Sequence, residues 1–200
     1  MNSFIEEQPG LVEKPASEVV HLFRVPFMQK SAAAELLKDT QLKISSQIVE
    51  IQTEQCYNVG LCSQLSSEKF SVLKWLLQET FEPENLGNES FLDKKRKEGL
   101  SPVIVEVGPR LSFTTAWSTN AVAICHACGL TEVTRLERSR RYLLFTTSEL
   151  QDHQINEFGV MVHDRMTECV YSQKLTSFET SVVPEEIRYI PVMERGRKAL

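Results

Sequence analysis

Apolar and polar residues alternate along four stretches of the chain, in the pattern that a strand with one buried face requires. Strands are predicted at residues 19–25, 48–59, 103–107 and 133–145. In the second strand Val49, Ile51 and Thr53 fall on one face, and in the third strand valines alternate before Gly108. The fourth strand contains ERSRR at residues 137–141, and this charged run is expected to interrupt it.

Two helices are predicted in the first half of the chain. One covers residues 32–38, which are rich in Ala and Leu, and Ser31 is expected to cap it. The other starts at Ser66 or Ser67 and places Phe70, Leu73 and Leu77 on one face.

Two more helices are predicted in the second half. Ser118 or Thr119 is expected to cap a helix over residues 120–128, and Gly129 follows where a left-handed residue ends a helix. A fourth helix is expected to start near Ser148. Its apolar face would carry Ile155, Phe158, Val162 and Met166, with His163 and Arg165 in the last turn.

This order is strand–helix–strand–helix, repeated twice. It predicts an α+β fold made of two βαβ-type, ferredoxin-like halves that form a pseudo-dimer, with an antiparallel sheet and helices on one face. Residues 1–17 are expected to be a flexible lead-in, residues 18–147 the domain, and residues 148–200 a helix and the start of a linker domain. Because the chain ends without a helix stop signal, we expect a truncated piece of a longer protein.

Composition and charge limit the classes of function that fit this chain. Hydrophobic residues make up 42% and charged residues 24%, as in soluble globular domains. The net charge of −5 argues against nucleic acid as the main partner. No apolar run reaches the ~20 residues that span a bilayer. The N-terminus has the features of neither a secretory signal nor a transit peptide, so a cytoplasmic location is expected from the chain as it stands.

Three motifs offer chemistry, and each has a simpler structural interpretation. Cys125-His126-Ala127-Cys128 has metal-ligand spacing, but without a second ligand pair we expect its cysteines to pack in the core. His163-Asp164-Arg165 could serve acid–base chemistry or end a helix. The basic run at residues 94–97 lies in a polar loop, 82–101, and is expected to be solvated; a localisation signal or a phosphate contact is the alternative.

Arginines gather in the fourth strand, at Arg135, Arg138, Arg140 and Arg141. Their forked side chains suit carboxylates and phosphates. They could keep an edge strand soluble or dock another domain. We predict docking, in which the preceding turn takes part. The residues predicted for this surface are Gly108, Arg110, Trp117, Asn120, Arg135, Arg138, Arg140 and Arg141.

The stretch VEVGPRLSFTTAWSTNAVAICHACGLTEVTRLERSRRYLL, at residues 105–144, resembles the N-terminal region of the large phosphoribosylformylglycinamidine synthases, most of all the plant forms. TEQCYNV at residues 53–59, HDRMTE at 163–168 and IRYIPVMERGRKAL at 187–200 support this resemblance in the same order. It covers roughly residues 18–200.

The resemblance implies an enzyme of purine biosynthesis that converts formylglycinamide ribonucleotide to formylglycinamidine ribonucleotide with ATP, magnesium and glutamine-derived ammonia. It implies that this chain is the scaffold next to the synthetase and glutaminase domains. The catalytic, nucleotide and metal motifs of the family would lie beyond Leu200, so no catalytic, cofactor-binding or metal residue is assigned here. Plant forms are expected in plastids or mitochondria. The alternative is a stand-alone regulatory domain that binds a small metabolite.

Overall fold

A computed structural model describes residues 18–179 and 190–199. Its elements, in chain order, are β1 (Glu18–Arg24), α1 (Lys30–Lys43), β2 (Ile48–Leu61), α2 (Ser67–Leu77), η1 (Pro83–Asn85), β3 (Leu86–Gly87), β4 (Ser101–Pro109), α3 (Ala116–Ala127), β5 (Val133–Thr146), α4 (Asp152–Val162), β6 (Glu168–Tyr171), α5 (Val192–Arg195) and η2 (Gly196–Ala199). No helix in these ranges is both long enough and apolar enough to cross a membrane.

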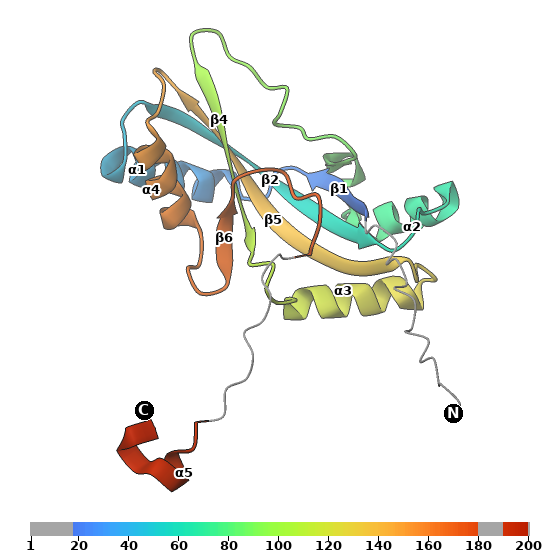
Figure 1. Ribbon diagram of the computed structural model, residues 1–200. Coiled ribbons are helices and arrows are strands. Elements are labelled where there is room, and N and C mark those ends of the chain that lie inside the picture. The colour runs from blue at the N-terminus through green and yellow to red at the C-terminus, as the bar shows by residue number, and fades with distance from the viewer. Residues whose placement is uncertain (1–17, 180–189, 200) are drawn as a thin grey trace, which may run out of the picture.

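The six strands described form one antiparallel sheet in the order β3-β1-β2-β5-β4-β6 (Figure 1). The two longest strands, β2 and β5, pair at the centre along their length, with Gln55 opposite Arg140 near the middle. β1 flanks β2 and β4 flanks β5, so each half supplies the same arrangement of strands. This confirms the prediction of an α+β fold with two ferredoxin-like halves.

The helices pack on one face of the sheet in pairs that mix the two halves. α1 and α4 cover the end of the sheet that carries Ile51, where Phe158 is fully buried. α2 and α3 cover the end that carries Val59, where Leu73 is fully buried. The domain therefore has two apolar clusters, and each joins a helix from the first half to a helix from the second.

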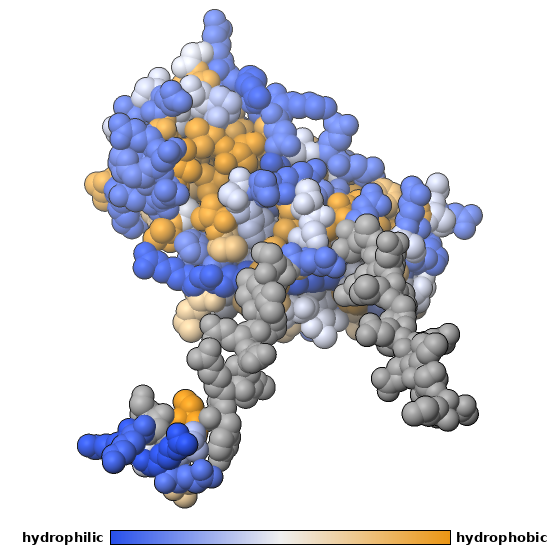
Figure 2. Space-filling model, in the orientation of Figure 1, coloured by the Kyte–Doolittle hydropathy of each residue, from blue (hydrophilic) through white to orange (hydrophobic). Residues whose placement is uncertain are grey.

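The opposite face of the sheet, called here the open face, is partly covered by the segment that follows β3. Leu92 from this segment is 1% exposed and packs on Leu143 and Phe145. Lys97 forms an ion pair with Glu50 on β2. The prediction of a solvated loop at residues 82–101 is therefore wrong for the apolar part of the segment. Apolar surface remains visible around β4 and β6 (Figure 2).

Both predictions about the central strands need correction. β5 runs without interruption through residues 137–141, because Glu137, Arg140 and Arg141 find partners on neighbouring strands and loops. Val49 does not share the face of Ile51, because a register irregularity between Ile48 and Glu50 shifts the alternation. Ile48 is buried and Val49 is 39% exposed.

Helix ends were predicted well where the capping residue was recognised. Ser66 caps α2, with its hydroxyl accepting the Lys69 N–H. Gly129 ends α3 with φ +82°, and the N–H of Leu130 donates to the carbonyl of Cys125, which completes a Schellman motif. The start of α3 was placed too late, because Thr115 is its cap.

The limits of α1 and α4 also differ from the prediction. Gln29, not Ser31, precedes α1, and the helix continues to Lys43. α4 begins after Gln151 and ends at Val162, so Arg165 and Met166 lie beyond it. Met166 is 85% exposed and takes no part in the apolar face. α4 packs in the same core as α1, although the domain boundary predicted at residue 147 precedes it.

Because both apolar clusters are built on β2 and β5, we expect them to unfold together. Phe158→Ala should lower the free energy of unfolding by about 3–5 kcal/mol. Trp117 packs on the other cluster. In urea titrations the midpoint from tryptophan fluorescence should nevertheless shift as far as the midpoint from far-ultraviolet circular dichroism. An unchanged fluorescence midpoint would show that the clusters unfold independently.

Candidate functional site

The predicted arginine cluster does not form one patch, because side chains alternate across a strand. Arg138 and Arg140 share the helix face of β5 with Leu136, which lies in the core cluster under α2 and α3. Arg135 and Arg141 point to the open face. The sheet therefore divides the four arginines into two pairs with different surroundings.

Arg141 lies within an ion cluster on the open face. Its guanidinium donates to Glu54 Oε1 at 2.5 Å and to Asp93 Oδ1 at 2.7 Å, and its Nε lies 3.2 Å from Glu106 Oε2. Its side chain is 11% exposed and that of Glu54 is fully buried. Ser90 and the backbone N–H of Phe91 also donate to Glu54. This arrangement ties the segment after β3 to the centre of the sheet.

The surroundings shift two pKa values in this cluster. Burial acts to lower the pKa of Arg141, but the bond to Asp93 and the charges of Glu54 and Glu106 outweigh burial and raise it. Burial raises the pKa of Glu106, against the opposing effects of the Ser139 hydroxyl and of Arg141. The guanidinium thus stays charged and holds the carboxylates together, which is a structural role.

A chain of polar side chains continues from this cluster towards β1. Ser139 Oγ donates to Glu106 Oε1 at 2.5 Å, and Asn58 Nδ2 donates to Ser139 Oγ at 3.0 Å. Asn58 Oδ1 lies 2.9 Å from His21 Nδ1, and Cys56 Sγ lies 3.8 Å from the same nitrogen. The connected groups join β1, β2, β5 and β4 across the open face.

The Cys56–His21 pair is not suited to nucleophilic chemistry. Burial raises the pKa of the Cys56 thiol, which therefore stays protonated at neutral pH. Burial, with a smaller effect from the charge of Lys174, lowers the pKa of His21 to about 4. A neutral thiol beside a neutral imidazole packs and hydrogen-bonds but supplies no thiolate.

Arg135 holds the turn after β4 in place. Its guanidinium donates to the backbone carbonyls of Leu111 and Phe113 and to Glu137 Oε1. Glu137, 1% exposed, also accepts from the N–H and hydroxyl of Thr115, the cap of α3. The N-terminal end of α3 is thus anchored to β5 by hydrogen bonds from Thr115 to Glu137, whose carboxylate is paired with Arg135 on the same strand.

Gly108 and Arg110 fix β6 and the chain before it. A Cβ at Gly108 would lie 2.6 Å from the Tyr171 hydroxyl oxygen, and this hydroxyl donates to the Pro109 carbonyl at 2.7 Å. Arg110 is exposed and donates to the Arg165 carbonyl. Gly108 is therefore required by close packing with Tyr171.

The helix face carries the other two arginines. The Arg138 guanidinium lies 4.3 Å from the centre of the Trp117 ring and has no carboxylate partner among the described residues. Arg140 donates to Glu168 Oε2 at 2.5 Å and stacks on Phe27. With Gln55 they line a cavity of about 270 Å³ beside the centre of the sheet. Of the predicted docking residues, Arg110, Asn120 and Arg138 are exposed to solvent, Gly108 is buried, and the other four are partly exposed.

The other motifs have structural surroundings. Cys125, 2% exposed, packs in the core as predicted, whereas Cys128 is exposed at the end of α3. His163 ends α4 and contacts the Gly159 carbonyl. No group of three or more His, Cys, Asp or Glu side chains suited to a metal ion occurs within the part of the chain described.

Sequence reasoning missed the buried acids Glu54 and Glu137. The sequence does carry a signal for both acids, since each lies on the open face beside an arginine of opposite charge. Glu54 on β2 is opposite Arg141 on β5, and Glu137 is two residues from Arg135 on β5. Seeing that signal required the register of β2 against β5.

Replacement of Arg141 should lower the free energy of unfolding far more than replacement of Arg138. Arg141→Leu leaves the buried Glu54 carboxylate without its cation, which should lower the free energy of unfolding by about 3–5 kcal/mol. Arg138→Leu removes only a contact with Trp117 and should cost less than about 1 kcal/mol. Urea unfolding of the two variants measures the difference, and equal losses would contradict the ion cluster.

His21 should make the stability depend on pH. The unfolded chain takes up a proton on this imidazole near pH 6.5, but the folded protein does so only near its pKa of about 4. The free energy of unfolding should therefore fall as pH is lowered through this window. His21→Gln should fall less between neutral pH and about pH 4.5 in urea titrations. If the free energy of unfolding fell equally with pH in the two proteins, folding would not lower the pKa of His21.

Comparison with known proteins identifies the family. The family model "Formylglycinamide ribonucleotide amidotransferase N-terminal" matches residues 54–179. Over 98% of its length the chain is 71% identical to an Arabidopsis thaliana protein named "Probable phosphoribosylformylglycinamidine synthase, chloroplastic/mitochondrial", of which it covers 14%.

More distant relatives carry the same protein name. Proteins named phosphoribosylformylglycinamidine synthase from Dictyostelium discoideum and Homo sapiens are 44% and 33% identical over 87% and 92% of the chain. The chain covers 13% and 14% of their lengths. It therefore belongs to the phosphoribosylformylglycinamidine synthase family, as part of its N-terminal region.

Proposed function

We propose that this chain is a scaffold module of a phosphoribosylformylglycinamidine synthase and performs no chemistry on its own. The match of residues 54–179 to the N-terminal family model carries the proposal. The environment of the polar groups supports it: Arg135, Arg140 and Arg141 are engaged in internal ion pairs, and the Cys56 thiol is buried. These contacts stabilise the domain.

In this proposal the remaining domains of the long protein carry the reaction. They bind ATP and magnesium, release ammonia from glutamine and convert formylglycinamide ribonucleotide to formylglycinamidine ribonucleotide. The module braces the synthetase and glutaminase domains against each other. The name of the Arabidopsis relative supports a plastid or mitochondrial location.

The proposed docking surface consists of the turn after β4 and the helix face of β5. Arg138, Arg110 and Asn120 present their side chains to solvent, so we propose that they contact the neighbouring domains directly. Gly108, Arg135 and Arg141 act behind them by fixing the turn and the strand, and Arg140 and Trp117 form the walls around Arg138.

The test replaces the matching segment of the Arabidopsis relative by this chain and introduces Arg138→Glu. If Arg138 docks a neighbouring domain that guides ammonia, glutamine-dependent synthesis should fall by at least about fivefold, or about 1 kcal/mol. Synthesis supported by added ammonia should fall less. The exposed Lys38 on α1 provides the control, as Lys38→Glu changes charge equally outside this surface.

Three results would contradict the proposal. The first is equal activity of the Arg138→Glu and Lys38→Glu proteins with glutamine. The second is turnover of glutamine or ATP by the 200-residue chain alone, and the third is an inactive unsubstituted chimera that is correctly folded.

A further inference from the structure

The two halves of the domain differ at one corresponding place beside the outer strands. α2 and α4 have 11 residues each, and their eighth residues are Lys74 and Gly159. A Cβ at Gly159 would lie 2.6 Å from Val170 Cγ2 on β6, so α4 approaches its outer strand closely. In the first half Lys74 lines an open space between α2 and the chain after β3.

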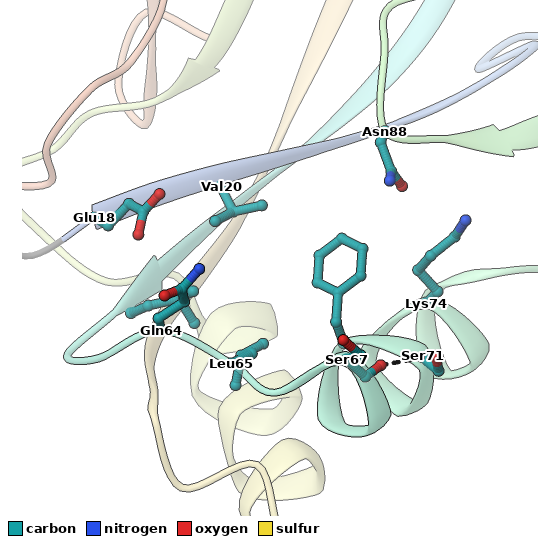
Figure 3. A pocket seen from close by; sticks show the side chains of 10 residues that line it. Glu18, Val20, Gln64, Leu65, Ser67, Ser71, Lys74 and Asn88 are labelled. Atoms are coloured by element: carbon teal, nitrogen blue, oxygen red, sulfur yellow. Dashed lines mark hydrogen bonds between the residues drawn. The ribbon is translucent and has the colours of Figure 1, made fainter.

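A groove of about 510 Å³ lies in the corresponding place in the first half. β1 forms one wall, through Glu18 and Val20, and α2 forms another. Figure 3 shows Glu18 at one end of the groove and Lys74 with Asn88 at the other, with Val20 and Leu65 between them. The groove carries opposite charges at its two ends, and between them the apolar side chains of Val20, Leu65 and Phe70 lie beside the polar side chains of Gln64, Ser67 and Ser71.

The outer edge of β1 is open along this groove. β3 pairs with β1 only at Phe23 and Arg24, and the N–H of Val25 donates to the Asn85 carbonyl on the same side. Alternate N–H groups of a strand point the same way, so those of Val19 and His21 also point to the outer edge. No described residue accepts them.

An open edge of this kind is a template for another strand, and proteins normally cover it. A covering strand can come from within the same protein, because the chain makes up only 14% of its Arabidopsis relative. The charged residues at the two ends of the groove restrict which segment can fill it. Neither Glu18 nor Lys74 has an ion-pair partner among the described residues.

We propose that an extended segment from the rest of the long protein adds to the outer edge of β1 and fills this groove. The segment places apolar side chains against Val20 and Leu65, a basic side chain near Glu18 and an acidic one near Lys74. The proposal rests on the proposed function in requiring the long protein, but it concerns a surface apart from Arg138 and the turn after β4.

Amide hydrogen exchange with single-residue resolution tests it. Exchange is measured in the 200-residue chain and in the chimera that carries this chain in the Arabidopsis relative. The amides of Val19 and His21 should exchange at least about tenfold more slowly in the chimera. The amides of Val20 and Leu22 point towards β2 and should be slow in both proteins, which makes them the internal reference.

Variants distinguish filling of the groove from general stabilisation. In the chimera, Lys74→Glu should return the exchange of Val19 and His21 towards the rate of the short chain, whereas Lys38→Glu on α1 should not. Fast exchange in both proteins would overturn the proposal. Slow exchange of these amides already in the isolated 200-residue chain would also overturn it, because the edge would then be covered by the chain itself. If that rate changed with protein concentration, the occupant would be a second copy of the chain. Synthase activity is a separate readout, so its loss would count against the proposed function without deciding the occupant of the groove.

Discussion

The pairing of β2 with β5 is the contact on which the rest of the domain depends. It is the only long strand pair described that joins the two halves, and both apolar clusters are built on it. The ion cluster on the open face also spans it, through Glu54 and Arg141. A slip of one residue would turn side chains to the opposite face, which would bury charges against the helices and separate Glu54 from Arg141. The buried ion pair therefore gives this pairing a specific register.

The same alternation decides what the arginines of β5 can do. Charged side chains on the open face are enclosed by the segment after β3 and by the turn before α3, so Arg135 and Arg141 become internal. On the helix face the two helix pairs leave the middle of the sheet uncovered, and Arg138 and Arg140 line the resulting cavity. The difference between structural and surface arginines thus comes from which layer covers each face. Their sequence neighbourhood is almost identical.

Local patterns in the sequence predicted the order of elements and the general architecture, because alternation and capping depend on nearby residues. The caps at Ser66 and Gly129 are examples. Contacts between distant segments could not be predicted in this way. The run at residues 137–141 looked like an interruption because its partners, such as Glu54 and Thr115, are far away in sequence. The candidate surface could not be predicted for the same reason: four arginines close in sequence were grouped together, although alternation along β5 places them on opposite faces of the sheet.

The pseudo-dimer also explains why one half can differ from the other. In a symmetric dimer of identical chains, a substitution at the eighth residue of the helix would change both outer grooves at once. Fusion into one chain removes this constraint, so Gly159 can pack closely against Val170 in one half while Lys74 lines an open groove in the other. The mixed packing of helices keeps the halves together while they diverge, because α1 and α4 share one cluster and α2 and α3 share the other. A doubled fold can thus keep one cooperative core and still present two unlike edges to the rest of a long protein.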